Sequence, residues 1–179
     1  MSNTDKGLAL VTGASYGVGA AVAKALARDG WTVAITATKV ENCAATAQSI
    51  RAAGGACLVR ALDLRAQDSI VALVESLWRE APVRALVNNA AVNLRRDAVD
   101  VSRDEWDSVM LANLTGTFFL TQAVGKRLIE AGLDGSIVTV SSSHALVGAP
   151  QRSTYGISKA GLVQMTRMLA VEWGSYNIR

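Results

Sequence analysis

Short apolar runs alternate with longer segments of helical periodicity along this chain. The apolar runs are Leu8–Val11, Thr32–Thr36, Cys57–Leu62, Ala85–Asn88 and Ile137–Ser141. The segments that follow them place apolar residues three and four positions apart, near 18–29, 41–53, 67–79, 103–130 and 152–174. Apolar strands that alternate with helices are typical of a parallel sheet covered on both faces. We therefore predict an α/β fold, a doubly wound parallel sheet with helices on both faces.

Several residues mark the ends of the predicted helices. Gly30, Gly54-Gly55 and Gly132 lie where three of the helices are expected to stop. Ser102 has Glu105 three residues later, which is the pattern of a capping box at the start of a helix.

A glycine turn follows the first apolar run and leads into a helix. Glycines 13, 17 and 19 let the backbone approach a pyrophosphate, whose charge suits the N–H groups at a helix N-terminus. The spacing matches neither the G-x-G-x-x-G fingerprint nor a Walker A loop. By itself this turn is a weak signal.

Ser142, Tyr155 and Lys159 are spaced as Ser, 12 residues, Tyr, 3 residues, Lys. On a helix, Tyr155 and Lys159 share a face, and a cation beside a phenol lowers the phenol's pKa from its ordinary value of about 10. Such a tyrosine can exchange a proton with a carbonyl or alcohol, and Ser142 can hydrogen-bond the same oxygen. The alternative is an ordinary helical pair, since the two-residue pattern is common.

Four motifs in this order resemble the short-chain dehydrogenase/reductase family, in the style of 3-oxoacyl-[acyl carrier protein] reductases and gluconate dehydrogenases. They are Thr12-Gly13-x-x-x-Gly17-x-Gly19, Asn88-Asn89-Ala90, Asn113, and Ser142 with Tyr155 and Lys159. The resemblance implies one NAD(P)-binding Rossmann-like domain over 1–179 and a reaction that moves hydride between a nicotinamide cofactor and a carbonyl or secondary alcohol. A glycine turn also occurs in S-adenosylmethionine methyltransferases, but no acid ends the second strand here.

The resemblance also implies roles for individual residues. Tyr155 would be the catalytic acid/base, Ser142 would polarise the substrate oxygen, and Lys159 would tune Tyr155 and hold the nicotinamide ribose. Asn113 would hold a water that links Lys159 to solvent; a helical Asn that bonds its own backbone is the alternative. The implied cofactor-binding residues are Gly13, Ser15, Tyr16, Gly17, Val18, Gly19, Thr38, Lys39, Asp63, Leu64, Asn89, Ala90, Ala91, Tyr155 and Lys159. For Asp63, a plain turn residue at a strand end is the competing interpretation.

Cofactor choice depends on the end of the second strand, where an acid would favour NAD. No acid occurs before Glu41, while Thr38 and Lys39 offer a hydroxyl and a charge to a 2′-phosphate. We therefore favour NADP(H), and a merely solvated Lys39 would leave NAD(H) open. Ala91 replaces the family's usual Gly, and Tyr16 stands where Arg is frequent in members that prefer the phosphate.

Composition excludes several other classes. Lys and Arg number 18 and Asp and Glu 15, a net charge of +3 without basic runs, so neither nucleic acid nor a membrane is an expected partner. Cys43 and Cys57 are isolated, which speaks against a metal site or a disulfide framework. His144 is the sole histidine, and no G-x-S-x-G elbow accompanies it. No signal peptide or long apolar span is evident, so a cytoplasmic protein is expected.

The chain ends at Asn177-Ile178-Arg179, where the resemblance implies further core strands. We therefore expect a C-terminal truncation, with Ile137–Val140 as an exposed apolar edge. A nucleotide-binding fragment or regulatory subunit without turnover is the alternative function. The resemblance further implies a homodimer or homotetramer formed through the helices 103–130 and 152–174.

Overall fold

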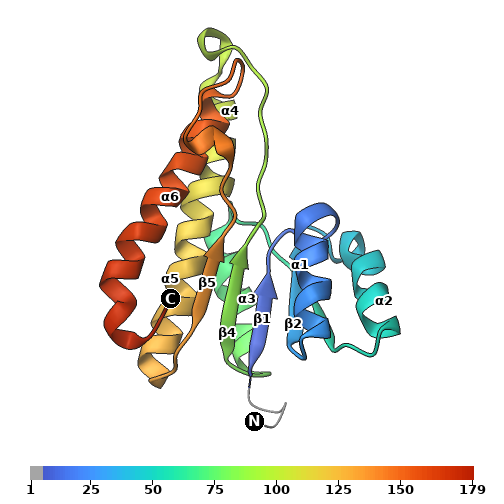
Figure 1. Cartoon of the computed structure of the whole chain (residues 1–179). Coiled ribbons are helices and arrows are strands. Elements are labelled where there is room, and N and C mark those ends of the chain that lie inside the picture. The colour runs from blue at the N-terminus through green and yellow to red at the C-terminus, as the bar shows by residue number, and fades with distance from the viewer. Residues whose placement is uncertain (1–5) are drawn as a thin grey trace.

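Within residues 6–179, which the computed structural model describes, five parallel strands form one sheet in the order β3-β2-β1-β4-β5 (Figure 1). Each predicted strand is confirmed to within two residues at either end. The strands are β1 (Leu8–Val11), β2 (Thr32–Ala37), β3 (Cys57–Ala61), β4 (Val83–Asn88) and β5 (Ser136–Thr139).

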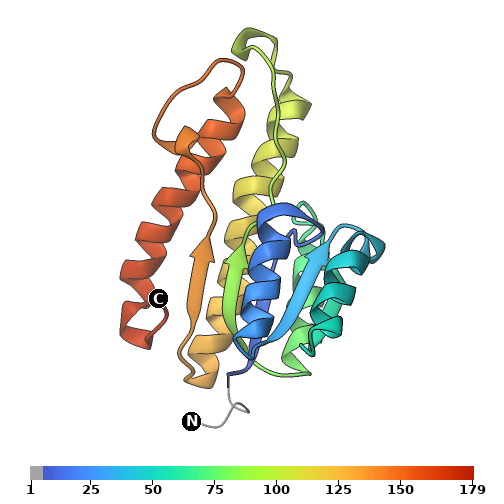
Figure 2. The same ribbon diagram turned by 45° about the vertical axis from the view of Figure 1, so that its right-hand side comes forward.

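Helices cover both faces of the sheet, as predicted. On one face lie α1 and α2; on the other lie α3 and α5, with α6 packed beside α5 (Figures 1 and 2). None of the helices in the described chain has the length and apolar content needed to cross a membrane. Their bounds are α1 (Gly17–Arg28), α2 (Ala44–Ala52), α3 (Gln67–Trp78), α4 (Arg103–Met110), α5 (Gly116–Ala131) and α6 (Ser153–Trp173).

The prediction of a single helix over 103–130 is wrong in one respect. A π-helical turn, Leu111–Thr115, separates α4 from α5. The apolar periodicity continues through this turn, with Val109 and Leu120 both buried, so the sequence pattern alone carries no sign of the interruption. Single π turns occur frequently at functional sites, and this one contains the fully buried Asn113.

The predicted helix ends are confirmed. Ser102 accepts a hydrogen bond from the Glu105 N–H, and the Glu105 carboxylate accepts one from the Ser102 N–H, which completes a capping box. Gly132 ends α5 in the left-handed conformation, with φ of 63°.

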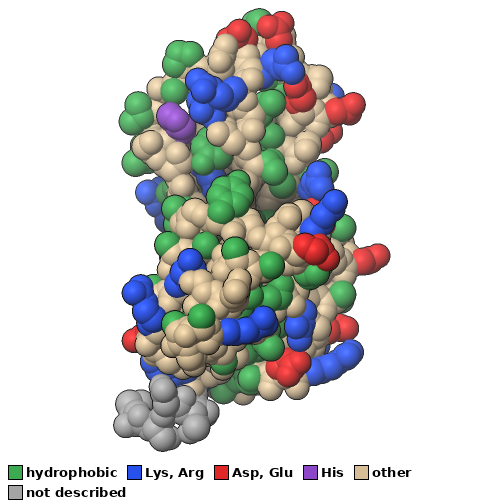
Figure 3. Space-filling view, turned by 90° about the vertical axis from the view of Figure 1, so that its right-hand side faces the viewer, with side chains coloured by type: hydrophobic (Ala, Val, Ile, Leu, Met, Phe, Trp, Pro, Cys, Tyr) green, Lys and Arg blue, Asp and Glu red, His purple; other side chains and the backbone are tan. Residues whose placement is uncertain are grey.

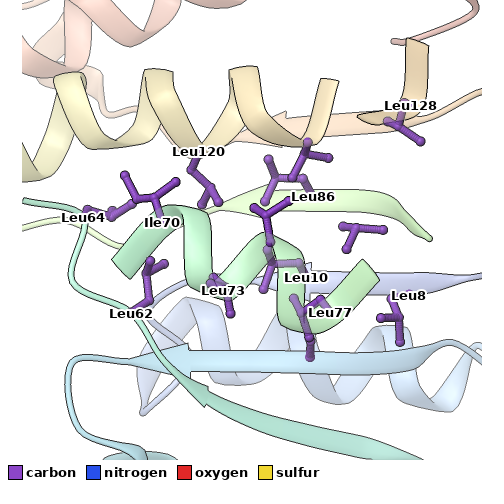
Figure 4. Close-up of a cluster of buried hydrophobic side chains, with 14 of the residues drawn as sticks. Leu8, Leu10, Leu62, Leu64, Ile70, Leu73, Leu77, Leu86, Leu120 and Leu128 are labelled. Carbon is purple, nitrogen blue, oxygen red and sulfur yellow. The ribbon is translucent and has the colours of Figure 1, made fainter. Parts of the chain in front are cut away.

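The larger of two apolar clusters lies between the sheet and the helices α3 and α5 (Figure 4). Side chains from all three layers meet there, and the strands contribute residues without a polar alternation because both faces of the sheet are covered. The smaller cluster lies under α1 and α2. Members of the larger cluster include Leu8, Leu10, Leu62, Leu64, Ile70, Leu73, Leu77, Leu86, Leu120 and Leu128.

The outer edge of β5 is only partly exposed, which corrects the expectation of a bare edge over Ile137–Val140. The Ile137 N–H donates to the Arg179 carbonyl at 2.6 Å, and the Arg179 N–H donates to the Gly135 carbonyl at 2.9 Å. Ile178 is buried against the larger cluster. Val138, further along the strand, is 55% exposed. The edge is therefore covered at the start of β5 and open towards its end.

A close approach of backbone fixes α5 against the loop after β3. A Cβ atom built on Gly116, the first residue of α5, would lie 1.9 Å from the carbonyl oxygen of Leu64. Only glycine leaves room for this contact, because the obstructing atom belongs to backbone and cannot rotate away.

We expect Gly116→Ala to lower the free energy of unfolding by about 1–3 kcal/mol, since the added methyl must displace α5 or the Leu64 loop. Urea unfolding would measure the change. Gly174→Ala is the matched control, because its Cβ would meet nothing within 4 Å. Equal stability of the two variants would contradict this account of the packing.

Candidate active site

A cleft opens at the carboxyl ends of β1 and β4, which are neighbours in the sheet. After β1 the chain continues to β2 on one side, and after β4 it continues to β5 on the other side. Ligands bind at this point in open parallel sheets. The cleft has a volume of about 430 Å³, and Figure 3 shows the hollow at the waist of this face. Its lining comes from the segments that follow four strands: Gly13, Ser15–Val18, Thr36–Thr38, Asn42, Leu62–Arg65, Asn89–Val92 and Ala112.

Hydrogen bonds join the glycine turn to the segment after β4. The Thr12 hydroxyl accepts from the N–H groups of Asn89 and Ala90, both at 3.0 Å, and donates to the Val87 carbonyl at 3.4 Å. In return the Asn89 amide donates to the carbonyls of Thr12 and Gly13, both at 3.0 Å. These bonds fix the two walls of the cleft relative to each other.

The glycine turn has the geometry of an anion cradle. Gly13 and Gly17 have φ of 64° and 61°, a region that favours glycine. At Gly19 a Cβ would lie 2.4 Å from the Gly13 carbonyl oxygen, so this glycine serves the packing of the turn. The helix α1 begins at Gly17 without a side-chain cap. Its first-turn N–H groups therefore remain free to bind phosphate oxygens, and the residues present fit a dinucleotide.

Asp63 forms a two-pronged ion pair at the opposite end of the cleft. Arg65 donates to its carboxylate through Nε at 3.0 Å and Nη2 at 2.9 Å. The hydrogen bonds from Arg65 hold the pKa of Asp63 below its usual range, so this group is a carboxylate at neutral pH. The buried Thr36 hydroxyl also borders the cleft and has no hydrogen-bond partner within residues 6–179. The Asp63 carboxylate can accept hydrogen bonds and the Thr36 hydroxyl is without a partner in the described chain, so both are suited to bind a nucleoside.

Most of the predicted cofactor residues line this one cleft: Gly13, Ser15, Tyr16, Gly17, Val18, Thr38, Asp63, Leu64, Asn89, Ala90 and Ala91. Gly19, Lys39, Tyr155 and Lys159 are not in its lining. Sequence reasoning missed Asn42 and Arg65, which do line it. Both closely follow the ends of strands, so the rule that places ligands at the carboxyl ends of parallel strands could have found them.

Lys159 is 2% exposed and lies against both the end of β5 and Tyr155. Its Nζ donates to the Val140 carbonyl at 2.8 Å and lies 5.8 Å from the centre of the Tyr155 ring. The Ser141 hydroxyl donates to the Lys159 carbonyl at 3.0 Å. Burial lowers the pKa of Lys159 from the ordinary 10.5. The predicted Tyr155 and Lys159 pair is thus brought together and tied to the segment that carries Ser142.

Ser142 lies just beyond β5 in extended backbone. Its hydroxyl accepts a hydrogen bond from the His144 N–H at 3.2 Å. The His144 ring meets the Tyr155 ring edge to face, with 6.3 Å between centres. The short helical turn Ser143–Ala145 therefore fixes the segment that leads from Ser142 past Tyr155.

Asn113 has partners that neither sequence interpretation expected. Its Oδ1 accepts from the Val92 N–H at 2.8 Å, and its Nδ2 donates to the Val92 carbonyl at 2.9 Å and to the Ser158 hydroxyl at 3.1 Å. The side chain thus holds the segment after β4 against α6. Within residues 6–179 it makes no direct hydrogen bond to Lys159, and the predicted link to Lys159 through a water stays a prediction.

Comparisons with known proteins agree with this architecture. Residues 7–179 match the family model described as short chain dehydrogenase. D-threitol dehydrogenase of Mycolicibacterium smegmatis is 39% identical over 98% of this chain, and 2-dehydro-3-deoxy-D-gluconate 5-dehydrogenase of Escherichia coli is 34% identical over 96%. The chain covers 67% of the length of each of these two proteins.

Among solved structures, a metagenomic short-chain oxidoreductase in complex with NADP superposes with a TM-score of 0.94. It is 32% identical, and the match covers 99% of this chain and 81% of that one.

The buried amine of Lys159 generates a pH-dependent prediction. We expect Lys159→Met to raise the free energy of unfolding at pH 7 by about 1 kcal/mol, because the charged amine is held where water cannot solvate it. The unfolded chain binds more protons than the folded one at pH values between the lowered pKa and 10.5, so the wild type gains stability as the pH rises there. The advantage of the variant should shrink towards pH 10.

Urea unfolding at pH 7 and pH 10 measures both quantities. Two results would contradict the prediction: a Lys159→Met variant that is less stable than the wild type at pH 7, or a stability difference in favour of the variant that grows with pH. Either would show that the buried amine contributes net stability.

Proposed function

The chain belongs to the short-chain dehydrogenase/reductase family, NAD(P)-dependent oxidoreductases that act on small alcohols and carbonyl compounds, and from that premise we propose which of its residues carry the reaction. The cofactor supplies or accepts hydride when bound. Tyr155 donates its phenolic proton to the substrate oxygen during reduction and takes it back during oxidation. Ser142 donates a hydrogen bond to that same oxygen and fixes its position.

One observation carries this assignment: the buried amine of Lys159 lies 5.8 Å from the Tyr155 ring and has no acidic partner within residues 6–179. A positive charge in a poorly solvated place favours the phenolate that remains after proton transfer. Asn113 acts as a positioning residue, since it binds Val92 on one side and Ser158 of α6 on the other.

NADP(H) is the proposed cofactor. No acidic residue lines the cleft at the end of β2, where a carboxylate would repel a 2′-phosphate. Thr38 lies at this point of the lining, and Lys39 follows it. Arg65 is a further basic side chain in the cleft, although it is bound to Asp63.

The two relatives named above suggest two kinds of small substrate. The threitol enzyme acts on an uncharged polyol, whereas the deoxygluconate enzyme acts on a sugar acid. We propose a polyhydroxy alcohol or its oxo form for this chain. The alternative of nucleotide binding without turnover is not favoured by these relatives, which are named dehydrogenases.

We also propose that copies of the chain assemble through α4, α5 and α6 in a reducing, cytoplasmic setting. Exposed apolar side chains on the outer side of α6 support the assembly, among them Met168 at 52% and Val171 at 84% exposed. Both cysteines are free thiols, which suits a reducing compartment. Light scattering that gives the mass of a single chain would reject the assembly.

Tyr155→Phe should lower the rate of substrate-dependent NADPH oxidation about 10²- to 10⁴-fold, because the variant lacks the proton that a general acid must give. NADPH affinity, measured by nucleotide fluorescence, should stay the same. Tyr176→Phe removes the same atom from an exposed tyrosine and serves as the control. Turnover that persists in Tyr155→Phe would refute the assignment, while binding without turnover in the wild type would support the alternative function.

The cofactor proposal predicts tighter binding of NADPH than of NADH. We expect Lys39→Glu to weaken NADPH binding about 10- to 100-fold and not to weaken NADH binding, since only the 2′-phosphate loses a charge-assisted hydrogen bond. Lys24→Glu, on α1 away from the cleft, makes the same charge change as a control. Tighter NADH binding by the wild type would overturn the preference.

A further inference from the structure

β3 forms one edge of the sheet, so one side of this strand has no strand partner within residues 6–179. On its inner side, the Ala56 carbonyl accepts from the Val33 N–H at 3.0 Å, and the Leu62 N–H donates to the Ala37 carbonyl at 2.9 Å. In a parallel pair, the peptide groups of alternate residues point to the same side of the strand. The residues of β3 whose N–H and C=O groups point outward are therefore Cys57, Val59 and Ala61.

Two arginine side chains bind outward carbonyls of this strand. Arg51, in the last turn of α2, donates through Nη2 to the Cys57 carbonyl at 3.0 Å. Arg60, within β3 itself, donates through Nη1 to the Val59 carbonyl at 3.0 Å. Charged donors thus occupy two neighbouring acceptors of the edge.

The two guanidinium groups approach the edge from opposite faces of the sheet. Side chains alternate along a strand, so Arg60 shares a face with Leu58, which packs against the larger apolar cluster. On that face its Nη2 donates to the Glu80 carboxylate at 3.2 Å, just beyond α3. Arg51 comes from α2, which covers the other face. The edge is therefore covered from both sides.

Without these side chains, the edge would suit another strand. A hollow of about 700 Å³ lies beside it, and Val40, Ala44, Ala47 and Val59 give this hollow an apolar lining. A row of free N–H and C=O groups next to an apolar surface is a template for strand pairing. Arg51 lines the same hollow, so its charge lies where an added strand would pack.

We propose that Arg51 and Arg60 close the β3 edge to a second copy of this chain. An added strand needs the outward carbonyls as acceptors, and the two guanidinium groups already bind those of Cys57 and Val59. Two β3 strands related by a twofold axis would also bring the arginines of both copies together, and like charges across a strand pair are unfavourable. Copies of the chain associate through other surfaces as a result. This inference does not depend on the proposed enzymatic function.

The double variant Arg51→Ala/Arg60→Ala removes both contacts and tests the proposal. We expect it to reach at least about twice the mass of the wild type as the protein concentration rises, because each copy gains a self-complementary surface. Light scattering over a series of concentrations measures the mass. The urea midpoint should stay nearly the same, since the partly exposed pair of Arg60 and Glu80 contributes little to stability.

A milder variant, Arg51→Ala, keeps the test decisive if the double variant fails to fold. Arg51 is exposed and forms no ion pair among the described residues, so its loss leaves the packing intact. We expect a smaller increase in mass from this single change. The matched control is Arg28→Ala/Arg79→Ala, which removes the same charge at exposed positions at the ends of α1 and α3 and should keep the wild-type mass.

A third substitution identifies the surface through which the double variant associates. Ala61→Pro removes an outward N–H at an exposed position and leaves the inner hydrogen bonds to β2 in place, so adding it should restore the wild-type mass. In the associated species, the outward N–H groups of β3 should exchange with deuterium more slowly than in the wild type.

Three results would overturn the inference. The first is a folded double variant, or a folded Arg51→Ala variant, with the same mass as the wild type. The second is an association that persists after Ala61→Pro, which would place the contact at β5 or α6. The third is an equal increase in mass of the Arg28→Ala/Arg79→Ala control, which would attribute the effect to net charge.

Discussion

The Thr12 hydroxyl connects the two halves of the sheet at the place where the cleft opens. It accepts from two consecutive N–H groups after β4 and donates to a carbonyl of β4 itself. The side-chain amide of Asn89 donates two hydrogen bonds to carbonyls of the glycine turn. Since β1 and β4 lead to opposite sides of the molecule, no helix could fix these two segments relative to each other. The position of the glycine turn relative to the segment after β4 follows from this reciprocal pairing.

A second set of contacts connects the cleft to the proposed catalytic residues, and it involves a buried charge. Lys159 is held between the Val140 carbonyl and the Tyr155 ring, where burial opposes its charged form. An apolar residue at position 159 would pack here without the cost of burying a charge. The site therefore retains a locally unfavourable group, as is expected where chemistry and stability make opposite demands on one position.

The strands, most helices and the cleft were predictable from the sequence because they follow from local signals. Apolar runs, glycines and the Ser102 capping box act over a few residues, so they can be read directly. The π turn was not predictable, since the apolar spacing of Val109 and Leu120 passes through it unchanged. The partners of Asn113 depend on where distant segments meet, which no local pattern contains. Whether the predicted residues perform their chemical roles stays a prediction.

The order of the strands also governs how the chain can assemble in time. Thr12 and Asn89 are separated by 77 positions, whereas β1, β2 and β3 are made and paired consecutively. During synthesis the segment through β3 can form early, but its glycine turn has no opposing wall until β4 leaves the ribosome. Tyr155 and Lys159 emerge still later. A nucleotide can consequently stabilise this protein only late in its synthesis, and the nascent chain must reach that stage on apolar contacts alone.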